Sequence, residues 1–294
     1  MLLNRQASTI GRELKRNCGL RGYRPQQAQR LSEERRCAAF KHRKVTPEVM
    51  NWIETLLAAD LSPEQVCGYL AQDQRLQLSH ETVYRLVYED WAAGGHWYLK
   101  LRHVPKGYRK RYASDQRRGQ IINRVSIDER PSIVDHKSRL GDWEGDTIIG
   151  KGHQSALLSL VERKSLYTIL VKLCGRNASD LADKLIAATE HLKDWLLTLT
   201  LDNGKEFAAH ERIAESLELK VYFAHPYSSW ERGINENTNG LVRQYFPKGT
   251  DFNQVADQEI QAVADKLNLR PRKTRGYQSP NQLFLRQTDD LLAA

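Results

Sequence analysis

Apolar and polar positions change their pattern near residue 140. Downstream of it, apolar segments of strand length occur at 142–150, 156–165, 166–174, 196–203 and 220–226. Segments with helical spacing occur at 179–193, 206–218 and about 231–245. Three consecutive strands followed by alternating strands and helices are typical of a mixed sheet with helices on its faces. The pattern therefore predicts an α/β domain over residues 136–250.

Upstream, apolar residues recur at helical spacing in three short segments between residues 45 and 93. Thr46 and Pro47 are suited to begin the first helix, and Ser79 is suited to cap the third. Three short helices with tight polar joints predict a helix-turn-helix. Its third helix would present His80, Glu81, Tyr84 and Arg85 to a major groove. A helical spacer that packs against the catalytic domain is the alternative.

The two ends of the chain are also predicted to be helical. Residues 1–44 contain a helix capped by Ser8, a glycine-containing break and a second helix opened by Pro25. Because Ile10 and Leu14 lack a preceding helix to pack against, we interpret this region as the remnant of an N-terminal helix-turn-helix and a following helix. Residues 251–294 are predicted to form a helical tail, with its last helix opened by Ser279.

Charge is distributed unevenly along the chain. Residues 1–130 carry 24 basic and 14 acidic residues, whereas residues 131–294 carry 21 and 22. The basic excess predicts a polyanionic partner for the N-terminal part, although a merely solvated surface is the alternative. Residues 94–135 are predicted to be a basic linker, in which Arg109, Lys110 and Arg111 track a phosphate backbone.

Composition excludes several classes of protein. No apolar run approaches the roughly 20 residues that span a bilayer, and the N-terminus lacks the pattern of a signal peptide. The four cysteines are scattered without a CxxC pair, so neither a zinc knuckle nor a disulfide framework is indicated. We expect a cytoplasmic, nucleoid-associated protein without a membrane partner.

Three carboxylates are the strongest candidates for catalysis. Asp146 lies in the first predicted strand, Asp202 ends the apolar strand before an Asn-Gly turn, and 33 residues separate Asp202 from Glu236 on a predicted helix. Hard divalent cations take oxygen ligands, and two such cations about 3.5 to 4 Å apart support phosphodiester chemistry. The triplet therefore predicts a two-metal site.

Neighbouring residues leave alternatives open. Strand alternation places Asp142, Glu144 and Asp146 on one face, so Glu144 is a rival for the first metal position. Arg232 and Arg243 lie at helical spacing from Glu236. They would either form a surface ion-pair ladder or hold a DNA phosphate bidentately.

Three asparagines occur in the helix that carries Glu236. Asn235, Asn237 and Asn239 are weak helix formers, so we expect them to contact DNA or groups around the metals. His225 and His210 are minor candidates for a general base, because a metal already lowers the pKa of bound water.

The strings WEGDTIIG, TLDNGKEF and HPYSSWERGINENTNGLVRQYFPKGTDF resemble the insertion-sequence-thirty (IS30) family of bacterial transposases. This family belongs to the Asp-Asp-Glu transposases and retroviral-type integrases, and the resemblance covers nearly the whole chain. It implies a ribonuclease-H-like core with a mixed five-stranded sheet and flanking helices, preceded by small all-helical DNA-binding segments. It also implies that Asp146, Asp202 and Glu236 are catalytic and hold two Mg²⁺ or Mn²⁺ ions.

The resemblance further implies a reaction and partners. Water attacks the phosphodiester at the element end, and the freed 3′ oxygen then attacks target DNA, without a covalent protein intermediate. Double-stranded DNA, as terminal repeats and target, and at least a homodimer are the implied partners.

Two other functions stay open at this point. The family normally has a longer region before STIGRELKRN, so a shortened DNA-binding repressor without transposition activity is the main alternative. A ribonuclease acting on hybrids fits the carboxylates but not the two DNA-reading segments.

Overall fold

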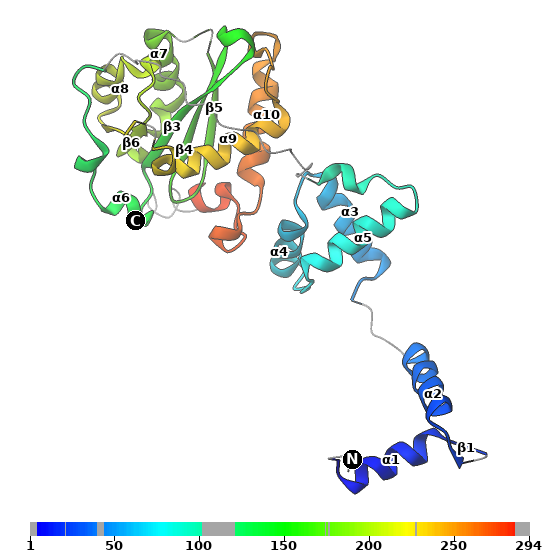
Figure 1. Cartoon of the computed structure of the whole chain (residues 1–294). Coiled ribbons are helices and arrows are strands. Elements are labelled where there is room, and N and C mark those ends of the chain that lie inside the picture. The colour runs from blue at the N-terminus through cyan, green and yellow to red at the C-terminus, as the bar shows by residue number, and fades with distance from the viewer. Residues whose placement is uncertain are drawn as a thin grey trace. The chain divides into compact units, whose positions relative to one another are not determined.

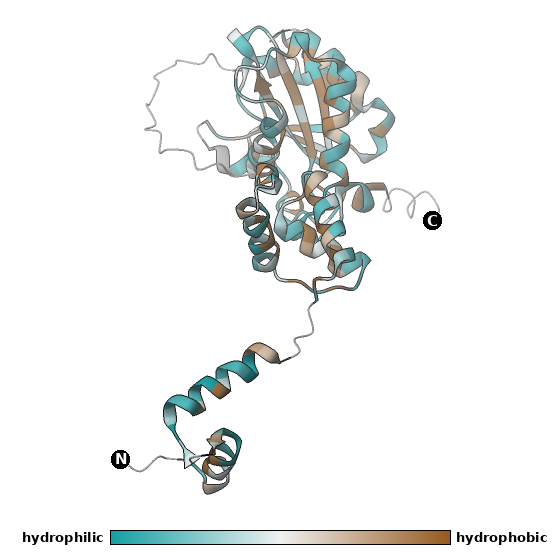
Figure 2. Cartoon of the chain, turned by 90° about the vertical axis from the view of Figure 1, so that its right-hand side faces the viewer, coloured by the Kyte–Doolittle hydropathy of each residue, from teal (hydrophilic) through white to brown (hydrophobic). Residues whose placement is uncertain are grey.

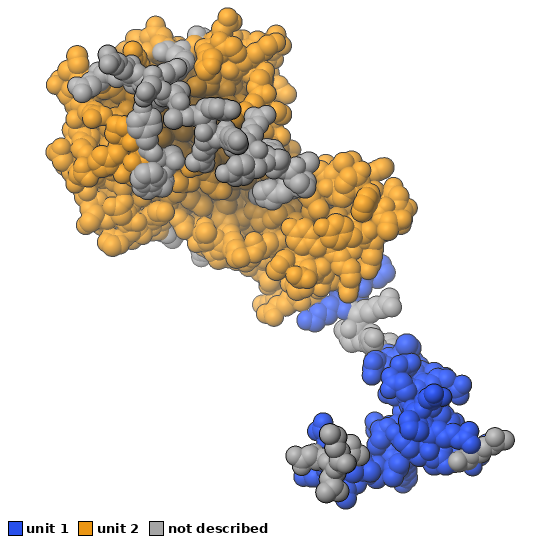
Figure 3. All heavy atoms as spheres, in the orientation of Figure 1, with its two compact units in different colours: residues 1–52 blue, residues 53–294 orange. Residues whose placement is uncertain are grey.

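A computed structural model describes residues 5–20, 22–39, 44–101, 121–173, 175, 177–226 and 228–285, except for the side chains of residues 229 and 230. The chain divides into two compact units, residues 1–52 and residues 53–294, which are coloured separately in Figure 3. In the described part of the chain, no helix is both long enough and apolar enough to cross a membrane.

The first two helices of the chain have little apolar burial. Helix α1 (Ala7–Asn17) and helix α2 (Pro25–Ala38) are joined by the short antiparallel strands β1 (Cys18–Gly19) and β2 (Gly22–Tyr23). Pro25 opens α2 as predicted, but the predicted cap at Ser8 is wrong, because Gln6 occupies the N-cap position of α1.

Three helices follow, and their predicted starts are confirmed. They are α3 (Pro47–Ala58), α4 (Pro63–Asp73) and α5 (His80–Ala92). The Thr46 hydroxyl accepts a hydrogen bond from the Val49 amide at 3.3 Å, and the Ser79 hydroxyl accepts one from the Thr82 amide at 3.3 Å. Apolar residues of all three helices, among them Ile53, Val66 and Val83, are fully buried.

Helix α4 and the turn before it pack against the C-terminal half of the chain. Gln65 Nε2 donates to the Pro271 carbonyl at 2.7 Å, and the Tyr245 hydroxyl donates to Asp60 Oδ2 at 3.3 Å. A Cβ atom at Gly68 would lie 2.1 Å from the Tyr277 ring, so this close approach requires glycine. Helices α3 to α5 therefore have the packing that the spacer alternative requires. The outer face of α5, which carries His80, Tyr84 and Arg85, stays exposed.

A five-stranded mixed sheet forms the centre of the second unit (Figure 1). Its strands are β3 (Asp142–Ile149), β4 (Ala156–Glu162), β5 (Thr168–Leu173), β6 (Thr198–Leu201) and β7 (Lys220–Phe223). The order is β5-β4-β3-β6-β7, with antiparallel pairing among the first three strands in sequence and parallel pairing of β6 with β3 and β7. This is the predicted ribonuclease-H-like arrangement.

Helices cover both faces of the sheet, whose strands are largely apolar in Figure 2. Trp143 and Leu199 belong to the core shared with α7 (Ala178–Thr189) and α8 (His210–Leu217). Ile148 and Leu157 belong to the core shared with α9 (Gly233–Tyr245) and α10 (Asp257–Leu269). Even-numbered positions of β3 thus face α9, as strand alternation predicts.

Short elements complete the second unit. They are η1 (Trp97–Lys100), η2 (Ile127–Glu129), α6 (Ile133–His136), η3 (Lys151–His153), η4 (Glu190–Trp195), η5 (Lys205–Phe207), η6 (Ser229–Arg232), η7 (Phe252–Gln254), η8 (Lys273–Arg275) and a last helix over 280–285. The Ser279 hydroxyl caps this last helix by accepting from the Gln282 amide at 3.2 Å, as predicted.

Two differences from the sequence expectation bear on the site. The helix predicted from about residue 231 begins at Gly233, because Arg232 has the non-helical angles φ −122° and ψ 39°. Residues 121–135, assigned to the basic linker, include the buried Ile121, and the Val125 carbonyl accepts from the Phe223 amide at 2.9 Å. The domain boundaries themselves stay predictions.

Candidate active site

Asp146 and Asp202 lie on neighbouring parallel strands. Strand β3 pairs with β6 so that Glu144 faces Thr200, and continuing this register by two residues sets Asp146 beside Asp202. Asp202 directly follows the last residue of β6. Open α/β sheets commonly place their sites at such carboxyl ends.

Arg232 lies between these two aspartates. Its Nη1 is 3.4 Å from Asp146 Oδ1, and its Nη2 is 3.9 Å from Asp202 Oδ2. Burial raises the pKa of the Asp146 carboxyl, the positive charge of Arg232 lowers it, and the negative charge of Asp202 raises it further. Asp146 and Asp202 thus share one cationic group.

The turn after β6 holds Asp202 by local contacts. Asp202 Oδ1 accepts from the Gly204 amide at 2.9 Å. A Cβ atom at Gly204 would lie 2.7 Å from Glu206 Cδ and 2.8 Å from Asp202 Oδ1, so a larger residue would displace one of these two carboxylates. Glu206 is buried and accepts from the Thr147 hydroxyl at 2.9 Å. Sequence reasoning missed Glu206, although it lies in the same TLDNGKEF string.

Helix α9 reaches Asp146 through an asparagine. Asn239 Nδ2 donates to Asp146 Oδ2 at 2.9 Å, while Asn239 Oδ1 accepts from the Ser159 hydroxyl of β4 at 2.8 Å. The expectation that asparagines of this helix contact groups around the site therefore agrees with the position of Asn239. Asn235 is fully buried, and Asn237 is exposed.

Glu236 is exposed on α9, three residues before Asn239. Across the described residues, no three His, Cys, Asp or Glu side chains are grouped closely enough to hold a metal ion. Asp146 and Asp202 lie side by side, because Arg232 contacts both. Glu236 lies on the adjoining helix α9 and does not complete a group of three with them.

Glu144 and Asp142 share the strand face of Asp146 but are engaged elsewhere. Glu144 Oε1 is 2.6 Å from Arg163 Nη1, and its Oε2 accepts from the Asn235 amide at 3.1 Å. Asp142 accepts from Arg139 Nε and Nη2, both at 2.9 Å. With both carboxylates buried and bonded, Asp146 is the aspartate or glutamate of β3 that adjoins Asp202.

Of the two alternatives for Arg232 and Arg243, the ion-pair ladder with Glu236 does not match their contacts. Arg232 lies before α9, beside the aspartates. Arg243 Nη2 donates to the Ile149 carbonyl at 2.6 Å, and its Nη1 is directed to the carbonyls of Phe246 and Pro247. Burial lowers the pKa of the Arg243 guanidinium. Its contacts join the end of α9 to the end of β3.

Neither histidine considered as a base is suited to that role. The ring nitrogens of His225 lie 2.8 Å from Glu231 Oε1 and 2.9 Å from Asp128 Oδ2. These two hydrogen bonds raise the pKa of His225. His210 is buried edge-on against Phe223, with ring centroids 4.9 Å apart.

The residues predicted to enter a major groove lie on α5. His80, Tyr84 and Arg85 are all exposed there, and Arg85 Nε is 3.6 Å from Glu89 Oε1. Arg109, Lys110 and Arg111 lie outside the described residues.

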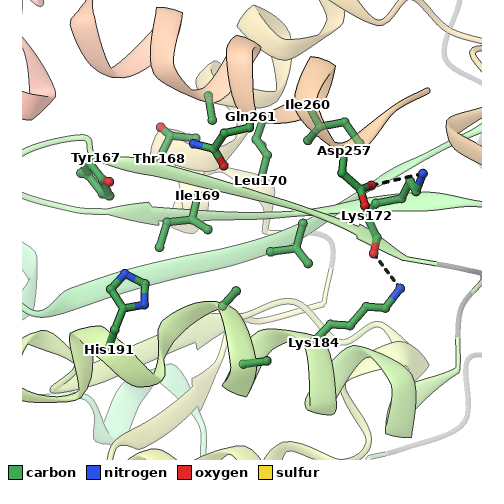
Figure 4. A pocket seen from close by; sticks show the side chains of 14 residues that line it. Tyr167, Thr168, Ile169, Leu170, Lys172, Lys184, His191, Asp257, Ile260 and Gln261 are labelled. Carbon is green, nitrogen blue, oxygen red and sulfur yellow. Dashed lines mark hydrogen bonds and ion pairs between the residues drawn. The ribbon is translucent and has the colours of Figure 1, made fainter.

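A separate hollow of about 670 Å³ lies along β5, between α7 and α10 (Figure 4). Its lining includes Lys172, Lys184, His191 and Asp257. None of the predicted catalytic residues lines it, so the carboxylate site is a separate region of the protein.

Comparison with known proteins identifies the family. A family model described as "Integrase core domain" matches residues 136–229, a span that contains Asp146 and Asp202. The transposase for insertion sequence element IS4351 of Bacteroides fragilis is 47% identical over 281 residues, covering 94% of this chain and 86% of the relative. Transposase InsI for insertion sequence element IS30A of Escherichia coli (strain K12) is 36% identical over 303 residues, covering 97% and 77%.

A solved structure, the catalytic core domain of BIV integrase, overlaps 52% of this chain and 99% of that chain with 17% identity and a TM-score of 0.41. The sequence relatives alone are sufficient, because their identity extends over most of both chains. The chain belongs to the IS30 family of insertion-sequence transposases.

Proposed function

We propose that this transposase cuts and joins DNA strands at a site formed by Asp146, Asp202 and Glu236, with two Mg²⁺ or Mn²⁺ ions. As a member of its family, the chain is a DNA-processing polynucleotidyl transferase, and an integrase core implies dependence on a divalent cation in general. The observation that carries the finer proposal is the sharing of one guanidinium by Asp146 and Asp202.

The position of Arg232 supports the fit of the site to a cation. Asp146 and Asp202 both direct an oxygen toward this positive group, and carboxylate oxygen is the donor that Mg²⁺ and Mn²⁺ take. When bound, two such ions activate the attacking oxygen and stabilise the leaving one.

Each protein group has its own part in this proposal. Asp146 and Asp202 provide oxygens from the rigid sheet, and Glu236 provides a third carboxylate from the exposed face of α9. Asn239 lies on the same helix as Glu236. It orients Asp146 by donating a hydrogen bond to one oxygen of the Asp146 carboxylate. Arg232 balances the two aspartates and, when they bind metal, becomes available to a DNA phosphate.

Duplex DNA is the proposed partner, as terminal repeats and as target. The exposed face of α5 and the basic excess of residues 1–130 are the features that support DNA binding. Joining two element ends requires that two sites act together, so we propose at least a homodimer on DNA, within the nucleoid.

The decisive experiment incubates the purified chain with labelled duplex ends of its own element and Mg²⁺ or Mn²⁺. We expect nicking that requires metal and that Asp202→Asn lowers by at least about 100-fold, the usual scale for loss of one transition-state stabiliser. Asp180→Asn is the control, and this variant should nick DNA at the normal rate. Asp180 lies on α7, on the face of the sheet opposite to α9.

Two outcomes would contradict the proposal. Metal-dependent nicking that survives Asp146→Asn, Asp202→Asn and Glu236→Gln together would place the chemistry elsewhere. A chain that binds the ends tightly but never cuts them, with either metal, would favour the repressor alternative.

A further inference from the structure

A buried glutamate connects the central strand to the helix that carries Glu236. Glu144 is 1% exposed and lies two residues before Asp146 on the same face of β3. Its Oε2 accepts from the Asn235 backbone amide at 3.1 Å. Asn235 lies in the first turn of α9 and directly precedes Glu236.

The other oxygen of Glu144 is held by a fixed arginine. Arg163 Nη1 lies 2.6 Å from Glu144 Oε1, and Arg163 Nε donates to the Val134 carbonyl at 3.2 Å. Arg163 Nη2 is 3.5 Å from Asp135, which also binds Arg130. Arg130 Nη1 in turn donates to the Thr200 hydroxyl of β6 at 2.9 Å. The carboxylate is therefore anchored to α6 and, through Arg130, to strand β6, which Asp202 directly follows.

This contact uses a backbone group that the helix cannot satisfy by itself. The first amides of an α-helix have no partner within the helix, and negative charge near them is stabilising. One turn later, Asn239 bonds to Asp146 and Ser159. The two contacts lie on either side of Glu236 in the sequence, and both join α9 to the sheet.

We propose that Glu144 is a positioning residue that fixes the first turn of α9, and with it Glu236, relative to Asp146. This inference rests on the proposed function, because it assigns Glu236 to the same metal site as the aspartates. Glu144 acts through the Asn235 amide and is not itself a metal ligand, since both of its oxygens are engaged in a fully buried site.

A purely structural role for the ion pair is the competing explanation. Replacing a buried ion pair by apolar residues of similar volume is often neutral for stability, so stability alone does not require this pair. The chain also offers a matched buried carboxylate. Glu162 is fully buried on β4, and it accepts from the amides of Gly141, Lys164 and Ser165 rather than from α9.

The test compares Glu144→Gln with Glu162→Gln in the full chain. Hydrogen exchange of peptides over residues 233–240 measures how firmly the first turn of α9 is held. Titration of nicking with Mn²⁺ measures how readily the site takes up the metal. We expect Glu144→Gln to speed exchange there and to raise the Mn²⁺ concentration for half-maximal nicking by about 10- to 100-fold, the scale found for residues that orient metal ligands. Glu162→Gln should leave both quantities within about twofold of the wild type, because it does not touch α9.

A second variant keeps the test valid if Glu144→Gln does not fold. Glu144→Leu combined with Arg163→Met removes both charges together while keeping similar volume, and it should fold yet show the same fast exchange and weak Mn²⁺ response. A folded Glu144 variant with wild-type exchange and wild-type Mn²⁺ dependence would overturn the proposal. So would equal changes in Glu162→Gln.

The outcomes also separate this inference from the proposed function. If the wild type fails to nick with any metal, the proposed function fails, whereas the exchange comparison still reports on the anchoring of α9. If nicking depends on Asp202 but not on Glu144, the proposed site stands and the positioning role is wrong.

Discussion

The charged residues of the central strand β3 and those of the outer face of α5 are held in contrasting ways. Arg163 and Glu144 pair at 2.6 Å with side chains 5% and 1% exposed. Arg85 and Glu89 pair at 3.6 Å with side chains 68% and 63% exposed. A buried charge requires a partner, whereas an exposed pair contributes only about 0 to 1 kcal/mol. On β3 and β4, the buried charged groups are therefore fixed by their partners, while the groups on α5 stay available to an external partner.

The largest expected difference comes from removing one member of each pair. Arg163→Met leaves the buried Glu144 carboxylate without its counter-ion, so we expect a loss of about 3 to 5 kcal/mol in the free energy of unfolding. Arg85→Met is the matched control and should change this free energy by less than about 0.5 kcal/mol. Urea unfolding followed by circular dichroism measures both. Equal effects of the two substitutions would remove the contrast.

The α5 face should respond in DNA binding rather than in stability. Arg85→Ala and Tyr84→Ala should weaken binding to the terminal repeats by about 1 to 3 kcal/mol if these residues contact bases, with the unfolding midpoint unchanged. If Arg85 contacts phosphate instead, the slope of binding against salt should fall by about 1. Fluorescence anisotropy at several salt concentrations distinguishes the two cases.

A spacer role for this module gives a different result. The packing of α4 against Pro271 and Tyr277 is what a spacer requires. Wild-type affinity and an unchanged salt slope in both α5 variants would favour that alternative and leave DNA reading to other parts of the chain.

The smallest expected effect is at His225, which is exposed yet held by Asp128 and Glu231. Because the pKa of His225 is raised in the folded state, its contribution to stability is complete below its ordinary value of 6.5 and is lost as pH rises through the raised value. The pKa of Asp128 is lowered by Ser126 and then by His225, so that carboxylate loses its contribution only as pH falls below its ordinary value of 3.8. The stability advantage of the wild type over His225→Gln should thus be greatest between pH 3.8 and pH 6.5, the ordinary pKa values of the two groups.

Thermal melts of the wild type and His225→Gln from pH 5 to 9 measure this advantage. It should decline toward pH 9, because neutral His225 no longer attracts the two carboxylates. An advantage that grows with pH would show that the ring is held in its neutral form.

Most elements were predictable from the sequence because their signals are local. Strand length, alternation along β3, the serine caps of α5 and the last helix, and the Asn-Gly turn after Asp202 depend on residues a few positions apart. The start of α9 was misplaced by about two residues, because Arg232 has non-helical backbone angles. Its side chain contacts aspartates that are distant in the sequence, which helical spacing does not reveal.

The sequence by itself determined the family, the order of strands and helices, and the candidate carboxylates. Only the tertiary structure decided which charged groups are partners. Arg232 and Arg243 are both at helical spacing from Glu236, yet one lies beside the aspartates and the other binds the end of β3. Glu144 and Asp146 share a face, yet one anchors α9 and the other adjoins Asp202. The reason is physical: periodicity sets the direction of a side chain, whereas its partner depends on strand register and on helices that are distant in the sequence.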